Sequence, residues 1–117
     1  GQRGIDAVRR VMVVDDEPLA RQRLASLVND LEHYQVVAMA GDGHAALELL
    51  ALEAPEILLL DIRMPGLNGL DLAEKLKVEM PEVKVVILTM HKSGEFVSKA
   101  LCAGVRGYVL KTMRWRS

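Results

Sequence analysis

The chain has 117 residues and a formal net charge of -1, and half of its residues are hydrophobic while only 3% are aromatic. This length suits a single domain with an aliphatic core, and a single cysteine, Cys102, excludes an intrachain disulfide. The near-neutral charge gives no electrostatic reason to expect direct binding to nucleic acid or to a membrane surface, and no apolar run is long enough for a transmembrane helix.

Short apolar runs alternate with longer amphipathic stretches along the whole chain. Strands are expected at 10–14, 34–40, 56–60, 83–89 and 107–111. Helices are expected to begin at Pro18, at Asp42 or Gly43, after Asn68 and at Ser93. Each helix carries apolar residues at helical spacing, so each has one face that must pack against another element.

This alternation predicts an α/β fold. Apolar strands separated by helices favour a doubly wound, five-stranded parallel sheet with flavodoxin-like order 2-1-3-4-5 and right-handed crossovers. We expect a polar lead-in at 1–9, one domain at 10–111 and a short tail at 112–117. That tail is too short and polar for a covering helix, so we expect the chain to end before the fifth helix.

Polar residues follow the ends of several predicted strands. Asp15 and Asp16 follow the first strand, and Asp61 follows the third. Thr89 ends the fourth strand and Lys111 ends the fifth. Functional groups of open parallel sheets gather at the carboxyl ends of the strands, so these five side chains are expected to converge.

Three carboxylates close together repel one another, and a raised pKa, a neighbouring cation or a metal ion would relieve that repulsion. Lys111 offers one positive charge. Mg²⁺ prefers oxygen ligands and leaves room for phosphate oxygens. An aspartate such as Asp61 can itself accept a phosphoryl group as an acyl phosphate. The pattern therefore favours phosphoryl-transfer chemistry at this edge of the sheet.

Four motifs give the chain a resemblance to the receiver domain of two-component response regulators. They are VVDDEP at 13–18, LLLDIRMPGLNGL at 58–70, VVILT at 85–89 and AGVRGYVLK at 103–111. The motifs match in order and spacing, and the resemblance covers nearly the whole chain from residue 10 to residue 111. A lone pair of aspartates would be weak evidence, whereas four motifs at four successive strand ends are specific.

The resemblance implies a role for each matching acidic residue. Asp61 would be the phosphoacceptor. Asp15, Asp16 and Asp61 would bind Mg²⁺, with Asp15 acting mainly through water, and the backbone carbonyl of Arg63 would be a further ligand. The phosphoryl donor would be a phosphohistidine on a sensor histidine kinase, and the reaction would be the domain's own phosphorylation rather than turnover of a substrate. The receiver itself would be cytoplasmic.

The resemblance also implies how the phosphoryl group would be sensed. Lys111 would contact the phosphoryl oxygens, Thr89 would hydrogen-bond to the group, and Tyr108 would change rotamer with it. The state would then be reported to a partner or to an output domain outside this chain. DNA-binding output in a transcription regulator is the expectation, and a homodimer is possible.

Two departures from the family pattern bear on signal output. The family usually has proline after the lysine, where this chain has Thr112, and it usually has a fifth helix. The segment DDEPLARQRL resembles regulators with one class of DNA-binding output, whereas ILTMH with GYVLK resembles those with a helix-turn-helix. The class of output domain therefore stays open.

Two other functions remain as alternatives. One is a phosphohydrolase with an aspartyl nucleophile, although such enzymes carry Asp-x-Asp and usually a cap domain, which this chain lacks. The other is a degenerate receiver that binds a partner without phosphorylation. The acidic residues could also be ordinary caps or solvated turn residues, and Phe96 and Val97 could belong either to a partner surface or to the core.

Overall fold

The structure, a computed structural model, describes residues 8–61, 69–88, 97–98 and 101, and at positions 61 and 69–71 it describes the backbone alone. Four strands form one parallel sheet: β1 (Arg9–Val14), β2 (Tyr34–Ala40), β3 (Ile57–Asp61) and β4 (Lys84–Leu88). Their order is β2-β1-β3-β4, which confirms the expected order as far as the described strands reach. The predicted fifth strand, 107–111, lies outside the described residues.

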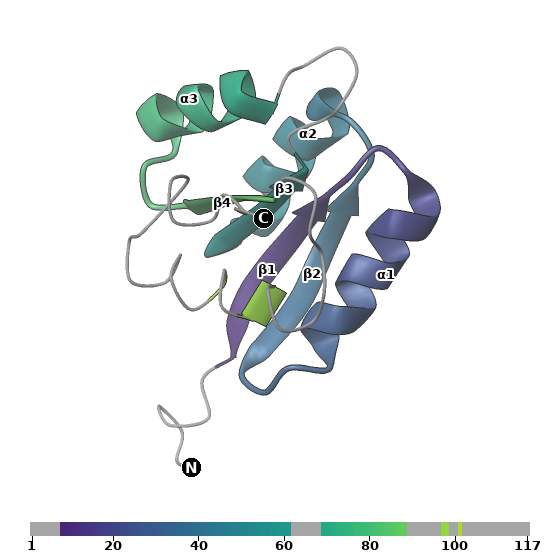
Figure 1. The fold of residues 1–117 in the computed structure, drawn as a ribbon. Helices are drawn as coiled ribbons and strands as arrows, with labels where there is room; N and C mark the ends of the chain where they lie inside the picture. The colour runs from purple at the N-terminus through teal and green to yellow at the C-terminus, as the bar shows by residue number, and fades with distance from the viewer. Residues whose placement is uncertain (1–7, 62–68, 89–96, 99–100, 102–117) are drawn as a thin grey trace, which may run out of the picture.

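Three helices connect the strands: α1 (Pro18–Asn29), α2 (Gly43–Glu53) and α3 (Gly69–Glu79). Figure 1 shows α1 on one face of the sheet and α2 and α3 on the other. This arrangement follows from right-handed crossovers, because β1 to β2 runs in one direction across the sheet and the next two connections run in the other.

Local sequence signals account for the helix ends. Pro18 is the first residue of α1, where its missing N–H and fixed φ suit a helix start. The Asp42 carboxylate caps α2 by accepting a hydrogen bond of 2.8 Å from the backbone N–H of Ala45. Beyond the end of α2, Ala54 has a φ of 44°, and the Arg10 guanidinium donates to the carbonyl oxygens of Glu53 and Ala54. A cation at this end also suits the helix dipole.

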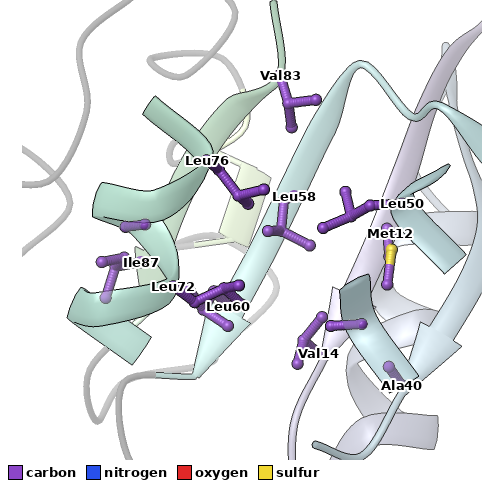
Figure 2. Packing of buried hydrophobic residues seen from close by; sticks show 12 residues of the cluster. Met12, Val14, Ala40, Leu50, Leu58, Leu60, Leu72, Leu76, Val83 and Ile87 are labelled. Atoms are coloured by element: carbon purple, nitrogen blue, oxygen red, sulfur yellow. The ribbon is translucent and has the colours of Figure 1, made fainter. Parts of the chain in front are cut away.

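Alternate residues of the central strands face opposite sides of the sheet and form two separate cores. The core beneath α2 and α3 contains, among others, Met12, Val14, Leu50, Leu58, Leu60, Leu72 and Leu76. Figure 2 shows the leucines of α3 directed at those of β3, and Leu50 of α2 beside Met12. The core beneath α1 contains, among others, Val11, Val13, Leu24, Val28, Ile57 and Leu59. Because both faces are covered, β1 is apolar from Val11 to Val14 and β3 is apolar from Ile57 to Leu60.

Val97 and Leu101 belong to the core on the α1 face. Both residues are helical and fully buried, and they cluster with Leu24 and Val28 of α1. Val97 is therefore a core residue, which decides between the two possibilities left open for it. Phe96 lies outside the described residues.

Candidate functional site

The carboxyl ends of β1 and β3 meet at one edge of the sheet. These strands are parallel neighbours, and Val14 of β1 pairs with Leu60 of β3. Asp15 and Asp61 each follow one residue later. Because neighbouring strands lie about 4.8 Å apart and consecutive Cα atoms about 3.8 Å apart, the backbone of Asp16 lies within roughly 9 Å of that of Asp61. The register therefore brings the three acidic positions to one place.

The structure gives Asp15 and Asp16 different surroundings. Asp15 is only 1% exposed. Its backbone N–H donates to the carbonyl oxygen of Ala40 at 3.1 Å, which extends the pairing of β1 with β2. Its Oδ1 accepts from the backbone N–H of Glu17 at 3.0 Å. A buried carboxylate needs such hydrogen bonds to offset its loss of hydration, whereas Asp16 is exposed and can meet an ion or a phosphoryl donor from solvent.

An arginine from α1 also contacts this loop. Nη1 of Arg21 donates to the backbone carbonyl oxygen of Asp15 at 2.8 Å. The guanidinium lies against Gly41, the residue after β2, where an added Cβ would lie 2.7 Å from Nη1. The strand-end pattern does not reveal Arg21, because Arg21 sits on a helix and acts through a backbone atom. The sequence feature that could have indicated a close side-chain approach was Gly41, a glycine directly after a strand.

Several predicted site residues fall outside what the structure describes. Only the backbone of Asp61 is described, and it pairs with Leu88 at the end of β4. Arg63, Thr89, Tyr108 and Lys111 lie outside the described residues, so their predicted roles stay predictions.

The described ligand atoms at this edge are oxygens, which a hard divalent cation prefers. Asp15 and Asp16 supply carboxylate oxygens at the end of β1, and the backbone of Asp61 ends the neighbouring strand. Mg²⁺ typically takes one or two carboxylates and completes its shell with water and phosphate oxygens. Among the described side chains, no three carboxylate, imidazole or thiol groups cluster closely enough to form a metal site by themselves. A third carboxylate would have to come from Asp61, whose side chain is outside that set.

A comparison with protein-family models identifies the family of the chain. The response regulator receiver domain matches residues 11–116, which is most of the chain. The chain belongs to the response regulator receiver family. A receiver is a signalling module of two-component transcription regulation rather than a conventional enzyme.

Curated relatives agree with this assignment. The chain is 45% identical over 105 residues to the positive alginate biosynthesis regulatory protein of Pseudomonas aeruginosa, an alignment that covers 89% of this chain and 42% of that protein. It is 36% identical over 102 residues to the transcriptional regulatory protein MctR of Rhizobium johnstonii, covering 87% of this chain and 48% of that protein. The chain thus spans about half the length of the curated relatives it matches.

Solved structures show the same fold. The signal receiver domain of the response regulator NarL from Mycobacterium tuberculosis has a TM-score of 0.67 and 34% identity, covering 82% of this chain and 77% of that one. RcsB from Salmonella typhimurium has a TM-score of 0.77 at 22% identity, covering 86% of this chain and 62% of that one, and at that identity it supports the fold alone. None of the helices in the described part of the receiver is long and apolar enough to cross a membrane.

Proposed function

We propose that this receiver accepts a phosphoryl group on Asp61 from a phosphohistidine of a sensor histidine kinase. The observation that carries the proposal is the register at the carboxyl edge, where Val14 pairs with Leu60 and Asp61 therefore ends its strand beside Asp15 and Asp16. In the transfer, an Asp61 carboxylate oxygen forms the new O–P bond while the P–N bond to the imidazole breaks. The leaving imidazole takes up a proton.

The other acidic residues prepare this edge for the incoming charge. Asp15, held by its backbone and side-chain hydrogen bonds, and the exposed Asp16 would hold Mg²⁺ together with Asp61 and the backbone carbonyl of Arg63. The bound ion would offset the mutual repulsion of the carboxylates and the charge of the phosphoryl oxygens. Without a cation, three adjacent carboxylates would repel an anionic donor.

Recognition of the phosphoryl group would fall to residues of the predicted fourth and fifth strands, 83–89 and 107–111. We propose that Lys111 and Thr89 contact the phosphoryl oxygens and that Tyr108 changes rotamer with them. A phosphoryl group adds about -1.5 to -2 charge, which is large enough to draw an ammonium and a hydroxyl toward it. A local charge change of this kind commonly shifts a two-state loop or helix face.

The full-length protein is proposed to be a cytoplasmic DNA-binding transcription regulator. The curated relatives are named as regulatory proteins, and this chain covers 42% and 48% of two of them. The remaining length in those relatives leaves room for an output domain. The receiver itself, with its near-neutral net charge of -1, carries no electrostatic case for binding nucleic acid directly.

Intact-mass spectrometry after treatment with acetyl phosphate and Mg²⁺ tests the proposal. We expect the wild-type chain to gain one hydroxylamine-labile phosphoryl adduct and Asp61→Asn to gain none. Asp30→Asn is a matched control, because Asp30 is exposed at the C-terminal end of α1. That end lies about 18 Å along the helix axis from the start of α1, so this variant should label like the wild type. Labelling of Asp61→Asn, or no labelling of the wild type, would refute the proposal.

A further inference from the structure

Arg21 reaches the peptide group that joins the two acidic residues after β1. Its Nη1 lies 2.8 Å from the carbonyl oxygen of Asp15, and the side chain is half-buried. That carbonyl belongs to the same planar unit as the N–H of Asp16. A hydrogen bond to the carbonyl therefore restrains the orientation of this peptide plane, and with it the backbone that carries the Asp16 side chain.

The neighbouring backbone is held by further hydrogen bonds, and Arg21 adds one at the Asp15–Asp16 peptide group itself. The N–H of Asp15 is held by Ala40, and the N–H of Glu17 is held by Oδ1 of Asp15. These two N–H groups belong to the peptide groups immediately before and after the Asp15–Asp16 peptide. Arg21 contacts the carbonyl oxygen of this peptide directly.

Gly41 makes the approach of Arg21 possible. A Cβ at position 41 would lie 2.7 Å from Nη1 and 3.5 Å from Cζ of Arg21, and the first of these separations is shorter than real Cβ contacts. The φ of Gly41 lies outside the left-handed region, so its backbone conformation does not itself require glycine. The absent side chain serves the arginine rather than a turn.

We propose that Arg21 is a positioning residue that orients the Asp16 carboxylate for Mg²⁺, and that Gly41 is the opening through which it does so. The inference rests on the proposed function, because it assumes that Asp16 is a ligand. Arg21 acts through the backbone, in the way that outer-shell partners orient metal ligands.

The positive charge of Arg21 has the opposite effect on a cation. A guanidinium near the site repels Mg²⁺, although water and salt screen that repulsion at a partly exposed position. The two effects are separable, since Gly41→Ala displaces the guanidinium and keeps its charge, whereas Arg21→Gln removes both. If positioning dominates, both variants weaken binding.

Mg²⁺ titrations followed by calorimetry test this with four variants. We expect Arg21→Gln and Gly41→Ala each to raise the Mg²⁺ dissociation constant roughly tenfold, the lower end of the loss seen when outer-shell partners are removed. The double variant should be no weaker than either single variant, because both changes break one contact. Arg23→Gln, an exposed arginine on the same helix, should bind like the wild type.

A second readout needs neither metal nor activity. In the metal-free protein, the amide chemical shift of Asp16 reports hydrogen bonding to the Asp15 carbonyl, because both atoms belong to one peptide group. We expect this shift to move in Arg21→Gln and in Gly41→Ala but not in Arg23→Gln. Gly41→Ala keeps the test valid should Arg21→Gln fail to fold, since it retains the arginine side chain and requires no strained backbone conformation at position 41.

The outcomes separate the inference from the proposed function. A wild type that binds Mg²⁺, with both variants binding equally well or more tightly, overturns the inference and leaves the proposed function standing. Additive losses in the double variant overturn it as well, as does weaker Mg²⁺ binding with an unmoved Asp16 amide. A wild type that binds no Mg²⁺ overturns both.

Discussion

Replacing Leu50 by alanine should remove a large part of the free energy of unfolding. Leu50 is fully buried in the core beneath α2 and α3, where Figure 2 shows it beside Met12 and near Leu58. Leu→Ala changes at such sites cost about 2.7–5 kcal/mol, through lost transfer free energy and the cavity that remains. A domain of this size has about 5–15 kcal/mol in total, so the loss is of the order of a third.

Leu52→Ala is the matched control. It makes the same chemical change on the same helix, but Leu52 is 77% exposed. A surface substitution away from special features changes stability by less than about 0.5 kcal/mol, and alanine is no worse than leucine as a helix former. The two variants therefore differ in burial alone.

Urea denaturation at equilibrium measures both costs. We expect Leu50→Ala to lower the denaturation midpoint without changing the slope, because the surface exposed on unfolding stays nearly the same. The melting temperature should fall by roughly 10–20 °C, at about 4 °C per kcal/mol for a domain near 100 residues. Equal costs for Leu50→Ala and Leu52→Ala, or a cost below about 1 kcal/mol at Leu50, would refute the packing described for α2.

Three further predictions concern single contacts. Asp42→Ala should destabilise the domain by about 1 kcal/mol in thermal melts, because the N–H of Ala45 loses its cap; an unchanged melting temperature would argue against the cap. Asp16→Asn should abolish the stabilisation by Mg²⁺, which for the wild type is about 1.4 kcal/mol at ten times the dissociation constant; a retained melting shift would remove Asp16 from the ligand set. Glu56→Gln should cost less than about 1 kcal/mol, and less still at high salt, because its 3.1 Å ion pair with Arg9 is half exposed; a larger, salt-independent loss in urea titrations would contradict this.

The hydrophobic periodicity of the sequence was sufficient to predict where the described strands and helices lie. The expected strands at 10–14, 34–40 and 83–89 match β1, β2 and β4 to within a residue or so, because each is a short, largely apolar run bounded by polar or turn-forming residues. Pro18 and Asp42 marked helix starts through chemistry that acts within one turn, and both starts are confirmed. Local signals of this kind require no knowledge of distant residues.

The sequence predicted at which edge of the sheet the acidic residues lie, but it predicted their surroundings only in part. Asp15, Asp16 and Asp61 could be assigned to one edge because carboxyl ends of parallel strands converge, and the register of β1 with β3 agrees for their backbone. That Asp15 would be buried and Asp16 exposed did not follow from the motif. Burial depends on how the loop after β1 packs against β2.

By itself, then, the sequence determined the order of elements, the apolar strands and the edge at which the acids gather, since each of these follows from spacing along the chain. Tertiary structure alone decided that Arg21 contacts the Asp15 carbonyl across Gly41, and that Val97 and Leu101 pack on the α1 face. Arg21 is 6 positions from Asp15 and 20 from Gly41, and Leu101 is 77 positions from Leu24. Such contacts depend on side-chain rotamers and on packing between elements, which the apolar stripe of a single helix does not specify.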